Sequence, residues 1–268
     1  MQYYLLRLQM NYHQYNGRYV KSNNYCKQLL AHIGKHEYLK KPSTIASIIA
    51  NKGYNAVFRG KFPDAYKHIT TAEQYFPVGS FNYTELQNIK FYAHYFSHAE
   101  EDAYALATYI QTAKYRKTAF QQAMWNYYLA VCYFNKGIYD KAQALLNQVQ
   151  ELKRDKAGWN LSIRILNICC SIELEKPLQA DKLLDQLRFY YYKKQGLGAR
   201  NNAIIKSILW LEDDYNYSKV YQKAQHEIDS LQSNKGWYKW DASRTPELFF
   251  FQRWFLAKMN KTEYKWEV

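Results

Sequence analysis

Two segments of this chain carry small residues at the same offsets, in a pattern that a closely packed pair of helices requires. The matched positions are Gly53 and Ala130, Ala56 and Tyr133, Gly60 and Gly137, Ala65 and Ala142, Ile69 and Leu146, and Ala72 and Val149. Two helices approach closely only where the facing side chains are small, and a glycine ends a helix by adopting a left-handed conformation. We therefore predict two helical hairpins, with turns at Gly60 and Gly137.

These offsets resemble those of the tetratricopeptide repeat, a helix-turn-helix unit of about 34 residues. A weaker copy surrounds Ala180, where Glu175 replaces the turn glycine and Pro177 opens the second helix. Turn centres near residues 17, 60, 98, 137, 175 and 215 lie about 40 residues apart, so the units are elongated and divergent. The chain is similar in this respect to the divergent tetratricopeptide-like proteins of Bacteroidetes-type bacteria.

Apolar residues recur at helical spacing through almost the whole chain. No stretch shows the sustained alternation of apolar and polar residues, flanked by Asn-Gly or Asp-Gly turns, that is typical of β-hairpins. We expect an all-α fold of about 12–13 helices. The resemblance implies a right-handed superhelical stack of antiparallel helix pairs, an α-solenoid. Residues 1–235 would form about six helix pairs, and the aromatic-rich residues 236–268 would form a capping helix that begins at Thr245 and Pro246.

The N-terminal run MQYYLLRLQM begins inside a helical pattern and has no polar capping element before it. This arrangement favours a fragment of a longer repeat protein, or an open helix pair that self-associates. No signal peptide is recognisable and no window of 18 apolar residues occurs, so we expect a cytoplasmic protein without a membrane span.

Composition limits the classes of function. The chain has 268 residues, of which 48% are hydrophobic, enough for a large core. Its 37 Lys and Arg residues exceed its 23 Asp and Glu residues, which gives a net charge of +14; the lysines are scattered, which favours a solvated surface over a dedicated polyanion site. Four cysteines, Cys26, Cys132, Cys169 and Cys170, lie in helical runs without metal-site or disulfide spacing and indicate a reducing compartment.

Few residues suggest a catalytic, nucleotide-binding or metal-binding site. Nucleotide-binding and metalloprotease motifs are absent from the sequence. His94 and His98 lie four residues apart, and acidic residues follow them, so a zinc site is an alternative to the commoner solvated pair at a helix end. We expect Cys169 and Cys170 to be buried and inert. We therefore expect no enzyme, no cofactor and no metal.

The resemblance implies a peptide-binding groove, because the first helix of each pair lines the concave face in tetratricopeptide proteins. The corresponding residues here are Tyr54, Phe58, Asn88, Tyr92, Tyr127, Val131, Phe134 and Asn135. They favour a protein or peptide ligand with an apolar or aromatic segment, whose backbone Asn135 would bind. Each aromatic at this spacing fits a core position between repeats equally well. Ala50 and Tyr54 replace the Lys and Asn that clamp a C-terminal carboxylate in some family members, which argues against chaperone-tail binding.

The alternative function is binding of single-stranded nucleic acid. Residues 188–206 interleave cations with tyrosines that could neutralise phosphates and stack on bases. The candidate patch comprises Arg188, Tyr191, Lys193, Lys194 and Arg200. The sequence lacks the regular base-reading positions of a one-repeat-per-base code.

Overall fold

The computed structural model describes residues 1–115, 117–153, 155, 158–193, 197–212, 215–241 and 245–266. These residues form thirteen α-helices, two short 3₁₀ helices and no β-strand, which confirms the prediction of an all-α fold. The chain divides into two compact units, Met1–Arg116 and Lys117–Val268. The sequence pattern did not indicate this division.

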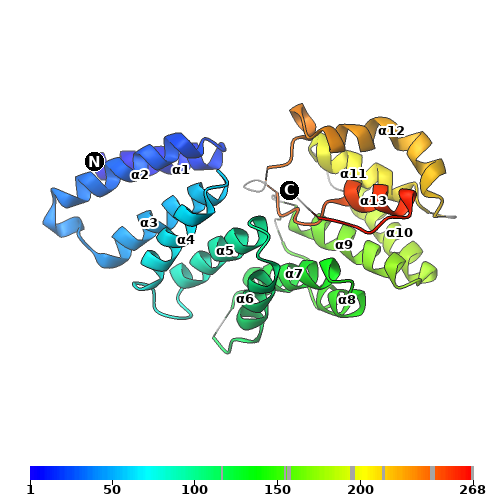
Figure 1. Cartoon of the computed structure of the whole chain (residues 1–268), viewed down its shortest axis with the longest axis horizontal. Coiled ribbons are helices and arrows are strands. Elements are labelled where there is room, and N and C mark those ends of the chain that lie inside the picture. Colours follow the sequence, from blue (N-terminus) through cyan, green and yellow to red (C-terminus); the bar gives the residue numbers. More distant parts are fainter. Residues whose placement is uncertain are drawn as a thin grey trace. The chain divides into compact units, whose positions relative to one another are not determined.

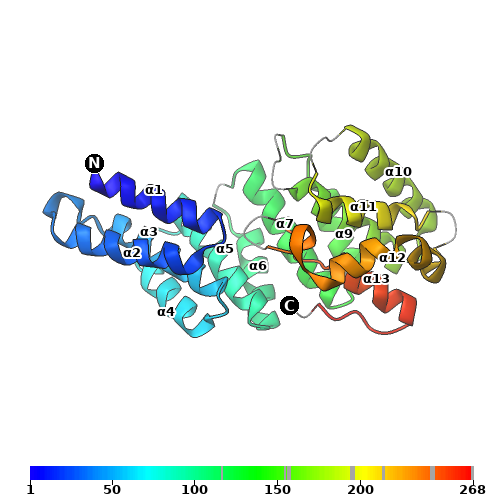
Figure 2. The same ribbon diagram turned by 90° about the horizontal axis from the view of Figure 1, so that it is seen from above.

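Unit 1 consists of three helix pairs and a short 3₁₀ helix (Figure 1). The elements are α1 (Gln2–Tyr15), α2 (Tyr19–Gly34), η1 (Glu37–Leu39), α3 (Pro42–Val57), α4 (Phe62–Glu73), α5 (Phe81–Phe96) and α6 (Glu100–Thr112). Each helix packs against the next one along the chain, and α3 also contacts α5. The pair α1 and α2 lies side by side in both views (Figure 2).

Unit 2 repeats this arrangement and adds one helix. Its elements are α7 (Ala119–Asn135), α8 (Tyr139–Asn147), α9 (Trp159–Glu173), α10 (Pro177–Lys193), α11 (Ala199–Leu209), α12 (Tyr217–Ser233), η2 (Gly236–Tyr238) and α13 (Phe251–Asn260). Helices adjacent in sequence are again adjacent in space, and α13 packs on α12. Within each unit, neighbouring helices therefore pack in sequence order.

Each of the six predicted turn centres has a residue in the left-handed region. Three are glycines, Gly17, Gly60 and Gly137, with φ of 67°, 66° and 72°. The other three are His98, Glu175 and Tyr215, with φ of 61°, 54° and 49°. A non-glycine residue is strained in the left-handed region. Because His98, Glu175 and Tyr215 nevertheless adopt it at their turns, the geometry of the turn overrides the conformational preference of the residue.

The hydrogen bonds at Gly137 and Glu175 are the same, although only one of them is a glycine. At the first turn the N–H of Gly137 donates to Phe134 (2.9 Å) and that of Ile138 to Tyr133 (2.9 Å). At the second, the N–H of Glu175 donates to Ile172 (3.0 Å) and that of Lys176 to Ser171 (3.0 Å). Both pairs are Schellman bonds, which satisfy the last carbonyl groups of the preceding helix.

The small residues lie where the paired helices meet. Ala65 and Ala142 are fully buried, as is Ala130. A Cβ atom added to Gly53 would lie 3.3 Å from Cγ1 of Ile69 and 3.7 Å from the carbonyl oxygen of Ala65, on the facing helix. A larger residue at position 53 would thus push α3 and α4 apart, which confirms the spacer role predicted for these positions.

The C-terminal helix differs from the prediction. It begins at Phe251 and not at Thr245, and Phe250 before it has an extended backbone. The preceding residues follow a path set by contacts with the rest of unit 2, which are described below. Here tertiary contacts override the local capping signal of Thr245 and Pro246.

In the part of the chain that the structure describes, no helix combines the length and the apolar character needed to cross a bilayer.

The turn geometry predicts different responses to the same substitution at two glycines. Gly137→Ala should lower the free energy of unfolding by about 1–2 kcal/mol, because alanine is strained at positive φ. A Cβ atom at Gly137 would meet nothing within 4 Å, so the loss comes from backbone conformation alone.

Gly34→Ala is the matched control, because Gly34 is the last residue of α2, lies outside the left-handed region, and its added Cβ also meets nothing within 4 Å. Urea unfolding should show no loss for this variant. Equal losses for the two variants would contradict the proposed role of the left-handed turn.

Candidate functional site

The predicted groove residues of α7 are covered by the C-terminal part of the same chain. Tyr127 and Val131 are fully buried, and Phe134 is 2% exposed. The backbone N–H of Leu248 donates to the Tyr127 hydroxyl at 3.3 Å. The ring of Phe134 lies 4.9 Å from that of Phe249, between ring centroids. A ligand therefore cannot reach these three side chains in this structure, and the predicted groove of α7 is already filled.

The covering segment, residues 245–250, contains no helix. Leu248, Phe249 and Phe250 are each at most 4% exposed. The N–H of Phe250 donates to the Tyr264 hydroxyl at 3.4 Å, so alternate backbone amides of the segment bind tyrosine hydroxyls. A chain that is buried without helical bonds needs such partners, because an unpaired buried amide costs free energy.

Both of these tyrosines are neutral at physiological pH, as ordinary tyrosines are, and burial strengthens that preference. Burial raises the pKa of Tyr127 far above its ordinary value, and it does the same to the pKa of Tyr264. Both hydroxyls thus remain protonated across the physiological range and accept hydrogen bonds from the segment as neutral groups.

A buried ion pair holds the start of the same segment. Arg200 on α11 donates from Nε to one carboxylate oxygen of Glu247 at 2.6 Å and from Nη2 to the other at 2.7 Å. The third bond runs from Nη1 to the carbonyl oxygen of Tyr238, at 2.8 Å. The two side chains are 8% and 7% exposed, so water does not screen the pair.

The predicted groove residues of unit 1 belong to a cluster of aromatic rings. Tyr54 and Phe58 on α3 lie 4.5 Å apart between centroids, and Phe58 lies 5.7 Å from Tyr92 on α5. Tyr19 of α2 stacks on Phe58 at 5.6 Å, and Phe96 stacks on Tyr92 at 5.8 Å. The first three rings are half-buried, so α3 and α5 together present one aromatic surface that is partly accessible.

The two predicted groove asparagines are only partly accessible. Both Asn88 and Asn135 are half-buried. The side-chain oxygen of Asn88 is enclosed and accepts no hydrogen bond within the described residues. Asn88 therefore does not present its carbonyl oxygen to a ligand in this structure.

The residues of the candidate nucleic-acid patch do not form one cationic surface. Arg200 is buried against Glu247, as described above. Arg188 lies between two carboxylates, those of Asp185 and Glu212. Tyr191 is half-buried with its ring 6.0 Å from that of Tyr192, and Lys194 lies outside the described residues. Of the five residues, Lys193 remains an exposed cation, over the ring of Phe189 at 4.0 Å.

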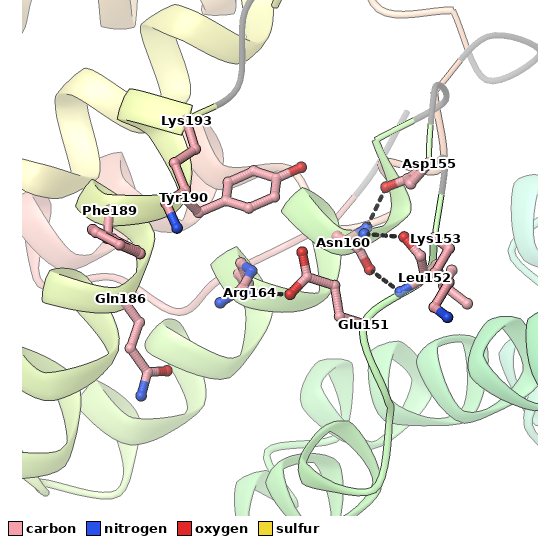
Figure 3. A pocket seen from close by; sticks show the side chains of 10 residues that line it. All are labelled: Glu151, Leu152, Lys153, Asp155, Asn160, Arg164, Gln186, Phe189, Tyr190 and Lys193. Atoms are coloured by element: carbon pink, nitrogen blue, oxygen red, sulfur yellow. Dashed lines mark hydrogen bonds and ion pairs between the residues drawn. The ribbon is translucent and has the colours of Figure 1, made fainter.

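Lys193 and Phe189 also line a cavity of about 740 Å³ between α9, α10 and the loop before α9 (Figure 3). Arg164 lies at its centre, with its guanidinium 5.0 Å from the centroid of the Tyr190 ring. One nitrogen of Arg164 is 3.3 Å from the Glu151 carboxylate, which is 62% exposed. The sequence did not predict this cavity, because its walls come from three separate segments. Its lining combines the rings of Phe189 and Tyr190 with three cationic side chains and two carboxylates.

Side-chain hydrogen bonds hold the backbone of the described loop residues that border the cavity. The side chain of Asn160 binds both the N–H and the carbonyl of Leu152, at 2.9 Å each. Asp155 accepts a hydrogen bond from the N–H group of Asn160 at 2.7 Å, at the start of α9 (Figure 3). It also accepts one from the N–H group of Gly158 at 2.9 Å. These bonds satisfy orphan donors of the helix terminus.

The two histidines proposed as zinc ligands are not on one helical face. His94 is in α5, whereas His98 follows the end of that helix in the left-handed turn. The Nδ1 atom of His94 is 3.2 Å from the Tyr66 hydroxyl and 3.8 Å from the Asp102 carboxylate. Burial lowers the pKa of His94 despite this carboxylate. The described residues contain no group of three His, Cys, Asp or Glu side chains arranged for a metal ion.

The thiols are buried, as the sequence predicted. Cys169 and Cys170 are fully enclosed, and burial raises the pKa of both. It raises the pKa of Cys26 to about 12. A thiolate is therefore rare at neutral pH in these positions, which makes the thiols poor nucleophiles.

No family model matches the sequence, and neither does any of the curated proteins. The resemblance to tetratricopeptide repeats consequently rests on the residues of this chain.

Removing one partner of the buried ion pair should strongly destabilise unit 2. Arg200→Leu should lower the free energy of unfolding by about 3–5 kcal/mol, because Glu247 is left as a buried charge without a partner. The double variant Arg200→Leu/Glu247→Leu should recover most of that loss. Chemical denaturation followed by circular dichroism measures both.

The control is Lys40→Leu, which breaks the exposed pair of Lys40 and Glu37, 39% and 87% exposed. Its effect should be about 1 kcal/mol or less. If Arg200→Leu costs no more than Lys40→Leu, the ion pair does not anchor the segment.

Proposed function

We propose that this chain is a tetratricopeptide-like scaffold that binds a protein or a peptide, and that it has no catalytic role. Three findings support the family assignment: helix pairs in sequence order, left-handed residues at all six expected turns, and buried small residues between paired helices. A right-handed superhelical stack is the arrangement that such pairs form in this family.

The observation that carries the proposal is the segment 245–250 on unit 2. It is an irregular apolar stretch, and it lies against the residues of α7 that the repeat pattern assigns to the ligand groove. Its backbone donates to Tyr127, and its Phe249 side chain packs on Phe134. The face thus combines aromatic surfaces with a hydroxyl that accepts from a main-chain amide, which is the combination an extended peptide needs.

In unit 1 the equivalent positions of α3 and α5 hold half-buried rings, so we assign the ligand to that surface. Phe58 lies at its centre, since it contacts Tyr19, Tyr54, Tyr92 and Phe96. Rings that are held in place by other rings lose little conformational entropy on binding. We expect the ligand to be an extended segment with apolar or aromatic side chains.

Selection from a random peptide library, followed by calorimetry on the full chain, tests this function. Phe58→Ala should weaken the selected peptides by at least about 10-fold, because an aromatic anchor at the centre of an interface contributes most of the binding energy. Thermal unfolding is recorded alongside, and Phe58→Leu replaces Phe58→Ala if the latter does not fold.

Phe81→Ala is the matched control, because Phe81 is an aromatic residue at the start of α5 that is 71% exposed. This variant should leave affinity unchanged. The function is refuted if no peptide is selected, or if both substitutions weaken binding equally.

Single-stranded nucleic acid remains the second candidate, favoured by the cavity beside Lys193 with its cations and rings. The pairing of Arg188 and Arg200 with carboxylates opposes it. The peptide function predicts no shift of single-stranded RNA at low salt. Tight binding that weakens steeply with salt, and that Arg164→Gln abolishes, would replace the peptide function with this one.

A further inference from the structure

Helix α1 is apolar on two opposite faces. The inner face holds Tyr3, Leu6, Met10 and His13, which are buried or packed on the core of unit 1. The outer face carries four large side chains, each more than half exposed: Leu5, 55%; Leu8, 64%; Tyr12, 53%; Tyr15, 76%. An ordinary surface helix has one apolar stripe, so the outer face of α1 needs an explanation.

The spacing of the outer residues is that of a helix–helix seam. Residues 5, 8, 12 and 15 follow steps of three, four and three, as do 3, 6, 10 and 13 on the inner face. The two series are offset by two residues, which places them about 200° apart on a helix of about 3.6 residues per turn. The inner seam packs within unit 1, and the outer seam has the same pattern as a coiled-coil interface.

Exposed apolar residues are concentrated in this helix. Of the eighteen large hydrophobic side chains exposed in the described residues, six lie within residues 1–15. Single exposed apolar residues are normal on a protein surface, whereas a contiguous stripe marks a contact surface.

The charge pattern indicates what that surface contacts. The whole chain has a net charge of +14, but the 14 residues of α1 contain Arg7 as their one Lys or Arg and no Asp or Glu. Gln2, Gln9 and Asn11, which flank the outer stripe, are uncharged amides. A charged partner would find no complement here. A second α1 would bring an apolar seam of the same period without placing like charges opposite one another.

We propose that α1 is a dimer interface, in which the outer stripes of two copies of this chain pack together about a twofold axis. Such an interface is isologous, so each stripe contacts its own equivalent. Leu8 and Tyr12 are the two inner residues of the stripe. Leu8 meets Leu8 of the second copy if the helices run parallel, and it meets Tyr12 of the second copy if they run antiparallel. This interface is separate from the aromatic surface around Phe58 and does not depend on peptide binding.

Sedimentation of the full chain over a range of concentrations tests the proposal. The parent should form a dimer in a concentration-dependent way. Leu8→Glu should raise the dissociation constant of the dimer by at least about 100-fold, because a carboxylate would be buried at the centre of an apolar interface. Its melting temperature at low concentration should match that of the parent, since Leu8 is exposed in the single chain.

Leu178→Glu is the matched control, because Leu178 is an exposed leucine, 87%, at the start of α10. It should leave association unchanged. As an independent readout, the double variant Leu8→Cys/Tyr12→Cys should give a disulfide-linked dimer on mild oxidation in either helix orientation, whereas the parent, whose four cysteines are buried, should not. A parent chain that stays monomeric at high concentration, or a Leu8→Glu variant that still dimerises, would overturn the proposal.

Discussion

The structure depends on one repeated constraint: two helices must reverse direction within a few residues and still pack closely along their length. The reversal requires a left-handed residue, and the close packing requires small side chains between the helices. The chain meets the first need at Gly17, Gly60 and Gly137 without strain, and at His98, Glu175 and Tyr215 with strain. The same Schellman bonds form at Gly137 and Glu175, so the hairpin geometry persists where the sequence signature has been lost.

The second organising feature is a return of the chain onto its own surface. In unit 2, the segment 245–250 lies against α7, and the pairing of Arg200 with Glu247 holds the segment there. An aromatic face that the repeat pattern assigns to a ligand thereby becomes core. In unit 1 the equivalent rings are held by one another and stay half-buried. The aromatic face of α7 in unit 2 is thus filled by the segment 245–250, whereas the aromatic face of α3 and α5 in unit 1 is partly accessible.

The sequence predicted the helix pairs and their turns, because a left-handed turn favours glycine and the close approach of two helices requires small residues at particular positions. It could not predict the partners of Arg200 or Tyr127, because those lie 47 and 121 residues away. Even so, the run Leu248–Phe251 contained a signal, since four consecutive apolar residues do not fit a helix with one buried face. The cavity beside Arg164 could not be predicted from the sequence, because its lining residues come from separate segments. For α1, the sequence indicated only that no polar capping element precedes the helix; the exposures and the packing revealed its two opposite apolar faces.

The functional account follows from the self-filled face, since it shows that this kind of helix surface accepts an irregular apolar chain. Hydrogen exchange of the backbone amides tests that point directly. Leu248 and Phe250 belong to no helix, yet their N–H groups donate to buried tyrosine hydroxyls. The account predicts that both amides exchange as slowly as those in the middle of α7. Exchange at the rate of an unstructured peptide would show that the segment does not occupy the face, and would contradict the account.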